Sequence, residues 1–181
     1  DYFDPSTTLE TEENELLSNW GMTRDKKLIL MPGRLTKWKG QEIFIEALNL
    51  VNKKLGPQSF CAVILGSDQG RDIYSKKIKR LAEQYRLTPQ LKFVEHCQNM
   101  PLAYKVSNLV VSASIEPEAF GRVAIEAQSM EKPIIASDIG GSNETITNNV
   151  SGFLFESNNP ESLSKKIIEV LNSDESRLKL I

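Results

Sequence analysis

The stretch KLILMPGRLTKWKGQEIFIEALNLVNKKL, residues 27–55, holds one complete strand–loop–helix unit. It opens with a mostly apolar run that ends at Gly33, which is typical of a strand buried on both faces of a sheet. From residue 41 the spacing changes, because residues such as Ile43 and Ala47 recur at helical intervals. The unit therefore predicts a buried strand followed by an amphipathic helix over 41–55.

The same unit recurs along the chain. Short apolar runs predict six strands, at 27–33, 60–66, 91–95, 108–114, 132–138 and 152–156. Amphipathic segments predict helices at 41–55, 71–86, 119–130 and 161–171. Buried strands joined by helical crossovers predict a parallel sheet with helices on both faces. The expected fold class is α/β, a Rossmann-like doubly wound sheet of about six strands.

The composition fits one domain of 181 residues, with 40% hydrophobic and 25% charged side chains. A formal charge of -2 argues against a nucleic-acid partner, and no apolar run approaches the roughly 20 residues that span a bilayer. Cys61 and Cys97 lie in or beside apolar runs, which favours buried thiols and a cytoplasmic location. Residues 1–26 are acidic and do not begin with Met, so we expect them to follow a missing N-terminal domain, with one domain over 27–181.

The loop after the first strand, GRLTKWKG at 33–40, carries a cluster of cations. In the common strand order 3-2-1-4-5-6, ligands bind at the carboxyl ends of strands 1 and 4, where the chain reverses direction. Arg34, Lys37 and Lys39, together with the amides of the following helix, suit a diphosphate. Surface cations on a solvated loop explain the same residues equally well.

The segment after the fourth strand, PEAFGRVAIEAQ at 117–128, holds two carboxylates in an apolar stretch. Phe120 belongs to the stripe that predicts the helix over 119–130, with Glu118 at its entrance and Glu126 about two turns in. Eight helical residues separate the carboxylates by about 12 Å along the axis, which would fit the two ends of a nucleotide sugar. Either glutamate alone is equally consistent with a surface charge.

Several common motifs are absent from the sequence. It has no Gly-x-Gly-x-x-Gly, which disfavours a dinucleotide dehydrogenase, and no P-loop. The single His96 cannot by itself assemble a metal site or a Ser-His-Asp triad. Since there is also no Asp-x-Asp pair, we expect neither a metal nor a cofactor.

In combination, five segments resemble the C-terminal half of retaining glycosyltransferases of family 4 type (glycosyl transferases group 1), which have the GT-B fold. The segments are PGRLTKWKG, LGSDQG, PEAFGRVAIEA, KPIIASDIGGSNETI and SGFLF, in this order between residues 28 and 171. The opening DYFDP is similar to the segment that follows the interdomain connection of that family. The resemblance implies a nucleotide-sugar (donor) binding domain that forms one half of a two-domain enzyme.

The resemblance also implies roles for individual residues. Arg34 and Lys39 would bind the donor diphosphate, Glu118 the hydroxyls of the donor sugar, and Glu126 the ribose, while the turn after Glu118 would bring backbone amides to the sugar and phosphate. The candidate catalytic residues are Glu118, Arg34 and Lys39. The candidate donor-binding residues are Gly33, Arg34, Lys39, Glu118, Ala119, Phe120, Gly121, Arg122 and Glu126. Two departures stand out, since Ala119 and Glu131 occupy places where the family more often has glycine.

The implied chemistry is transfer of a hexosyl group from a nucleotide diphosphate sugar, with retention and without metal. The acceptor, a glycan or lipid, would bind the missing N-terminal domain, so this chain alone would be inactive. Cell-surface polysaccharide or lipopolysaccharide synthesis is the expected pathway, with peripheral association of the full protein at the inner face of the membrane. Two alternatives remain open at this point: a sugar-nucleotide epimerase of GT-B fold, and a non-catalytic module that senses a nucleotide.

Overall fold

A computed structural model of the chain describes residues 2–70 and 72–173. Its centre is one sheet of six parallel strands in the order β3-β2-β1-β4-β5-β6. The strands are β1 (Lys27–Pro32), β2 (Phe60–Leu65), β3 (Leu91–Val94), β4 (Leu109–Ser112), β5 (Ile134–Ser137) and β6 (Phe153–Phe155). The six predicted strands, their parallel pairing and the reversal of direction between β1 and β4 are confirmed.

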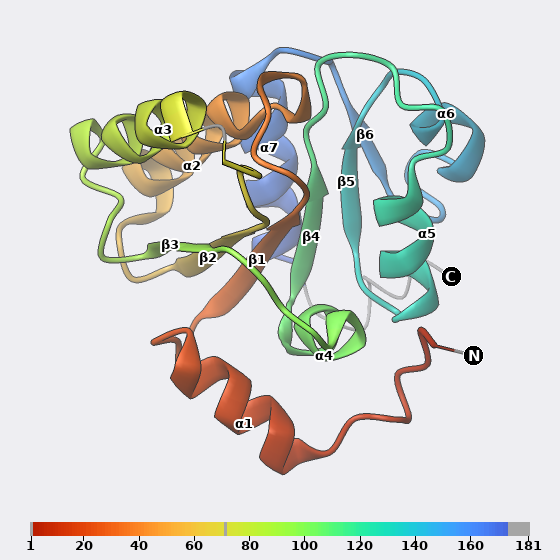
Figure 1. Cartoon of the computed structure of the whole chain (residues 1–181). Coiled ribbons are helices and arrows are strands. Elements are labelled where there is room, and N and C mark those ends of the chain that lie inside the picture. Colours follow the sequence, from red (N-terminus) through yellow and green to blue (C-terminus); the bar gives the residue numbers. More distant parts are fainter. Residues whose placement is uncertain (1, 71, 174–181) are drawn as a thin grey trace.

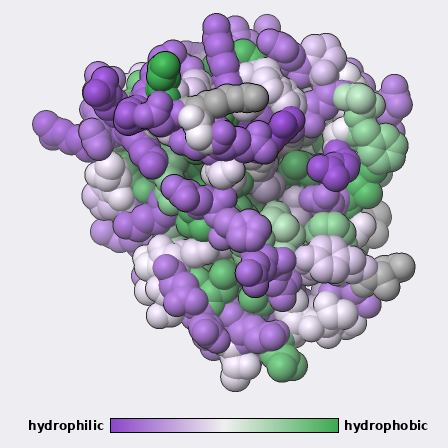
Figure 2. Space-filling view, viewed as in Figure 1, coloured by the Kyte–Doolittle hydropathy of each residue, from purple (hydrophilic) through white to green (hydrophobic). Residues whose placement is uncertain are grey.

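Helices cover both faces of the sheet (Figure 1). One layer consists of α2 (Gln41–Leu55), α3 (Asp72–Gln84) and α7 (Pro160–Leu171), and the other of α1 (Glu10–Asn19), α4 (Met100–Val106) and α5 (Arg122–Ser129). Along β1, Ile29 packs in the core of the first layer and Leu28 in that of the second. Because both faces of the sheet are buried, successive residues of a strand are apolar whichever face they are on. Figure 2 shows mostly hydrophilic side chains outside these cores, with apolar ones recessed between them.

The helix predictions succeed where the apolar stripe is long. The helix predicted over 41–55 is confirmed at both ends, and the one predicted over 161–171 is confirmed to within a residue. Helix α3 lies inside the predicted range 71–86, of which residue 71 is outside the described residues. The start of the helix predicted over 119–130 is wrong. Gly121, with φ 60, adopts a left-handed conformation immediately before α5, so the helix begins at Arg122. Phe120 is consequently 63% exposed and does not belong to the core.

Helices α1 and α4 were not predicted. Helix α4 has only seven residues, too few for a periodic signal, and α1 lies in the acidic segment. Leu17 of α1 is nevertheless buried, in the same core as residues of α4. Part of the acidic segment therefore packs on the sheet domain, while the division of the chain at residue 26 stays a prediction. Of the residues up to 181 assigned to that domain, those after 173 lie outside the described part.

Helix α5 ends in a tight turn at Glu131. Its amide bonds to the carbonyl oxygen of Gln128 at 2.9 Å, and the amide of Lys132 bonds to that of Ala127 at 2.9 Å, which is the Schellman pattern. Glu131 has φ 54, a conformation that favours glycine. Glu131, which stands where the family more often has glycine, thus lies at the C-terminus of a helix, as the predicted end of that helix at residue 130 implies.

Throughout the described part of the chain, no helix is long and apolar enough to cross a membrane.

Candidate functional site

The loops that follow β1 and β4 lie against each other. Gly40 has φ 72, and a Cβ at this position would lie 1.8 Å from the carbonyl oxygen of Ala113. The amide of Ile115 donates a hydrogen bond of 2.8 Å to the carbonyl oxygen of Trp38. Because only glycine fits at position 40, the basic loop can approach the loop that carries Glu118.

This contact joins Lys39 to Glu118. Lys39 Nζ lies 2.7 Å from Glu118 Oε1, and the two side chains are only 14% and 17% exposed. Ser114 Oγ donates to the same carboxylate oxygen. Glu118 is therefore held from two sides, and its second oxygen has no hydrogen-bond partner among residues 2–70 and 72–173.

Trp38 contacts two of the three cations of the basic loop, Arg34 and Lys39. Lys39 Nζ lies 4.4 Å from the centroid of the indole ring, and Arg34 Cζ lies 5.9 Å from it. Cation–π contacts of this kind contribute about 0.5–1 kcal/mol at exposed sites. Gln41 Nε2 also donates to the carbonyl oxygen of Arg34 at 2.8 Å, so the backbone of the loop is fixed while the guanidinium stays exposed.

The Glu118 loop rests on two glycines that follow β5. The amide of Gly141 donates to the carbonyl oxygen of Glu118 at 2.8 Å. A Cβ on Gly141 would lie 2.8 Å from the carbonyl carbon of Phe120, and one on Gly140 would lie 2.8 Å from backbone atoms of Glu118. This close packing of backbone on backbone fixes the position of Glu118. The amide of Gly141 is therefore used inside the protein.

Glu126 lies on α5 and is held by α4. The hydroxyl of Tyr104 donates to Glu126 Oε2 at 2.7 Å, and the side chain of Tyr104 is fully buried. Burial, and secondly the negative charge of Glu126, raise the pKa of the Tyr104 phenol far above its usual value. The phenol therefore stays protonated and acts as the hydrogen-bond donor.

These groups line one cavity of about 390 Å³ at the carboxyl ends of β1 and β4. Six of the nine donor-binding candidates lie in its wall: Gly33, Arg34, Lys39, Glu118, Arg122 and Glu126. The prediction that the basic loop and the first carboxylate face one cleft is confirmed. The other three candidates, Ala119, Phe120 and Gly121, form the turn beside the cavity and do not line it.

The remaining lining residues were not predicted; they are Pro32, Trp38, Met100, Tyr104 and Val123. An aromatic ring between two lysines was the available signal for Trp38. Met100 and Tyr104 lie four positions apart on helix α4, and because this helix was not predicted, no pattern placed them beside Glu126.

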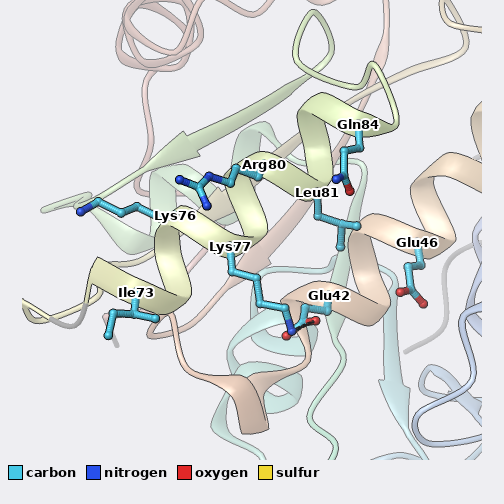
Figure 3. Close-up of a pocket in the computed structure, with 8 residues that line it drawn as sticks. All are labelled: Glu42, Glu46, Ile73, Lys76, Lys77, Arg80, Leu81 and Gln84. Atoms are coloured by element: carbon cyan, nitrogen blue, oxygen red, sulfur yellow. Dashed lines mark ion pairs between the residues drawn. The ribbon is translucent and has the colours of Figure 1, made fainter.

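A larger hollow, of about 570 Å³, lies between α2 and α3 (Figure 3). Its wall consists of Glu42, Glu46, Ile73, Lys76, Lys77, Arg80, Leu81 and Gln84. Lys77 Nζ lies 2.6 Å from Glu42 Oε2, but the lysine side chain is 60% exposed. The hollow contains none of the donor-binding candidates and lies away from the switch point, so the smaller cavity is the candidate site.

In the described ranges, no three side chains of His, Cys, Asp or Glu are grouped so that they could hold a metal ion. Positive charge in the cavity comes instead from Arg34, Lys39 and Arg122. The arrangement can bind an anion beside Trp38 and accept hydrogen bonds from hydroxyl groups at two carboxylates.

The sequence and the fold match a known family. The family described as glycosyl transferases group 1 matches residues 13–181. The chain belongs to this family. Its sheet and flanking helices form one half of the GT-B fold, as the resemblance implied.

Solved structures and a curated relative agree with this placement. A glycosyltransferase from Rickettsia africae is 34% identical with a TM-score of 0.93, over 99% of this chain and 47% of that one. Anabaena HepE, solved in complex with UDP-glucose, is 28% identical with a TM-score of 0.86, over 98% of this chain and 48% of that one. D-inositol 3-phosphate glycosyltransferase from Xylanimonas cellulosilytica is 27% identical over 172 residues, 94% of this chain and 40% of that protein. This group 1 domain thus spans about two fifths of the length of the curated relatives it matches.

Proposed function

We propose that this group 1 domain is the donor-binding half of a retaining, metal-independent hexosyltransferase. It would bind a nucleotide diphosphate sugar whose sugar is passed to a glycan or lipid-linked acceptor. The observation that carries the proposal is the single cavity in which Arg34, Lys39, Glu118 and Glu126 meet. Family membership supports it, as does the UDP-glucose complex of Anabaena HepE, which has the same fold.

In the proposed reaction, the bond between sugar C1 and the diphosphate oxygen breaks, and a bond between C1 and the acceptor oxygen forms on the same face. The acceptor proton passes to the leaving diphosphate. Arg34 and Lys39 stabilise the negative charge that develops on this group, which is an electrostatic task. Lys39 can do so from a fixed position, because Trp38 and Glu118 hold its side chain.

The two glutamates would position the donor rather than transfer protons. Glu118 Oε2, which has no partner within the described part of the chain, would accept a hydrogen bond from a hydroxyl of the donor sugar. Glu126 would accept one from the ribose. The turn at 119–121, beside the cavity, would offer backbone amides to the sugar and phosphate.

We further propose that the acceptor binds a second domain and that this chain alone is inactive. The chain matches only about two fifths of the length of its curated relatives, which supports a contribution from further sequence. The full protein would act in the cytoplasm, in peripheral association with the inner face of the membrane, in synthesis of cell-surface polysaccharide or lipopolysaccharide.

Calorimetric titration with UDP, GDP and ADP tests donor binding. At least one of these should bind, and Arg34→Ala and Glu126→Ala should each weaken its binding. Lys77→Ala is the matched control, because Lys77 is a paired cation in the hollow between α2 and α3. If both cavity variants bind as tightly as the unchanged chain, the site assignment is wrong.

Turnover by the full-length protein tests the reaction. NMR of the product reports whether the anomeric configuration of the donor sugar is retained, and EDTA should leave the rate unchanged if no metal takes part. Conversion of the nucleotide sugar without an acceptor would indicate an epimerase. Absence of turnover with every nucleotide sugar and acceptor extract would indicate a module that only senses the nucleotide.

A further inference from the structure

A buried hydrogen bond between α4 and α5 fixes one side of the Glu126 carboxylate. We propose that Tyr104 is a positioning residue: its hydroxyl holds Glu126 Oε2, so that Oε1 is presented to the ribose and the site selects ribonucleotides over deoxyribonucleotides. The proposal rests on the proposed function, which places the ribose at Glu126.

The geometry leaves one carboxylate oxygen for the ligand. The phenol of Tyr104 has a single proton, which it donates to Oε2 at 2.7 Å. No other residue of the described ranges donates a hydrogen bond to Glu126 Oε1. Both residues line the cavity, so the Glu126 carboxylate lies where a ligand can reach it.

The Tyr104 ring cannot move away from this position without a change in the core. It is fully buried, and the ring of Phe3 packs against it edge to face, with centroids 5.8 Å apart and an interplanar angle of 77°. Lys105, the next residue on α4, donates to the carbonyl oxygen of Pro5 at 2.9 Å and ties the same N-terminal segment to the helix. At the start of α4, Asn99 Oδ1 accepts a hydrogen bond from the amide of Leu102.

A fixed carboxylate distinguishes ligands by their hydroxyl groups. A glutamate side chain has several rotamers, and binding a hydroxyl would otherwise require one of them to be selected. With Glu126 already oriented, a ribose hydroxyl gains a charge-assisted hydrogen bond at little entropic cost. A deoxyribose lacks that donor and leaves the oriented carboxylate without a partner, which is how a polar site rejects an analogue.

The test compares ribonucleotides with their deoxy forms. The protein is titrated with UDP, GDP and ADP, each beside its 2′-deoxy and 3′-deoxy analogue, before and after Tyr104→Phe. The nucleotide that binds should lose roughly two- to ten-fold in affinity, the size expected when one flexible side chain must first be ordered on binding. The affinity of Tyr104→Phe for the deoxy analogue that lacks the recognised hydroxyl should equal that of the unchanged protein. The ratio of ribonucleotide affinity to deoxy-analogue affinity should therefore fall toward one.

Tyr74→Phe on α3 is the matched control. Like the Tyr104 change it removes one tyrosine hydroxyl, but the Tyr74 side chain is only partly buried, its hydroxyl has no hydrogen-bond partner among the described residues, and it lies outside the cavity; the ratio of ribose to deoxyribose affinity should not change. Thermal unfolding of both variants shows whether either change merely loosens the fold.

Two results would overturn the proposal. The first is unchanged affinity for both the ribose and the deoxy forms in Tyr104→Phe, and the second is equal weakening of the two forms, which would mean that Tyr104 acts only through the fold; either result leaves the ratio unchanged. Glu126→Gln separates these from failure of the proposed function. If Glu126→Gln leaves ribonucleotide binding unchanged, the ribose does not lie at Glu126 and both proposals fall. If Glu126→Gln brings the ratio of ribose to deoxyribose affinity to one while Tyr104→Phe leaves it unchanged, only the role proposed for Tyr104 is wrong.

Discussion

Two hollows among the described residues each contain a lysine–glutamate pair, and the two pairs have almost the same length. In the cavity between the β1 and β4 loops, Lys39 Nζ and Glu118 Oε1 lie 2.7 Å apart with side chains 14% and 17% exposed. Between α2 and α3, Lys77 Nζ and Glu42 Oε2 lie 2.6 Å apart with side chains 60% and 23% exposed. The second hollow is the larger one, but distance and volume do not distinguish a binding site from a charged surface.

The difference lies in what surrounds each pair. Trp38 lies beside Lys39, Ser114 donates to Glu118, and Gly141 holds the backbone of the glutamate. Lys77 instead extends from α3 toward Glu42 on α2, and its side chain remains 60% exposed (Figure 3). Charges whose positions are fixed before the ligand arrives can bind it without first losing side-chain freedom. The following predictions test whether this contrast governs function.

The largest effect is expected from removing the fixed cation. Lys39→Met should weaken binding of UDP, GDP or ADP, whichever binds, by about 2–3 kcal/mol, because it removes a charged donor to the diphosphate and leaves Glu118 without its ion pair. Lys77→Met should leave this affinity unchanged. Calorimetry of both variants measures the contrast. Equal losses in the two would show that only the overall charge of the protein matters.

The second prediction concerns the backbone beneath Glu118. Gly141→Ala should lower the free energy of unfolding by about 1–3 kcal/mol, because its Cβ would press on the backbone of Phe120. It should also weaken nucleotide binding, since the loop must shift. Gly21→Ala is the control: Gly21 has φ 65 but no atom within 4 Å of a Cβ, so strain should cost stability and spare binding. Unchanged nucleotide affinity in Gly141→Ala would show that packing against Gly141 does not fix the loop that carries Glu118.

The positions of the charged residues could be predicted from the sequence, but the residues that hold them in place could not. Periodic burial placed the strands and α2, because a core side chain recurs at a fixed interval. The switch-point rule placed the loop of Arg34 and Lys39 near Glu118, although Lys39 and Glu118 are 79 residues apart, because the ends of neighbouring strands meet whatever the intervening chain does. These are properties of the backbone pattern.

What could not be predicted depends on local conformation and on packing between helices. Phe120 fits the apolar spacing of a helix, but one left-handed glycine starts the helix later and exposes the ring. Helix α4 is too short for Tyr104 to belong to a long periodic pattern, and its contact with Glu126 depends on α4 and α5 packing on the same face of the sheet. The residues that orient the charges were therefore missed, although the charges themselves were found.

The third prediction measures the coupling inside each pair. In double-mutant cycles of unfolding free energy, Lys39→Met with Glu118→Gln should give a coupling of about 1–2 kcal/mol, because both side chains are largely withdrawn from water. Lys77→Met with Glu42→Gln should give about 0.5 kcal/mol or less, as exposed pairs do. Urea unfolding at low and high salt provides the values, and salt should reduce the second coupling more. A stronger coupling at Lys77 would reverse the comparison.

The smallest effect is expected at Glu46, in the wall of the hollow between α2 and α3. Partial burial, and then the charges of Glu42 and Glu161, raise the pKa of its carboxyl above 4.5. The folded protein thus holds this proton more tightly than the unfolded chain, so the carboxyl lowers stability as the pH rises from 4.5 through its folded pKa. Glu46→Gln should be neutral at pH 4 and stabilise the fold by up to about 0.5 kcal/mol at pH 7, a small gain because solvent screens the site. Urea unfolding at the two pH values measures it. If Glu46→Gln stabilised the fold at pH 4 but not at pH 7, the folded protein would favour the ionised Glu46 carboxylate. The hollow between α2 and α3 would then resemble the cavity, where the surrounding residues stabilise the charges.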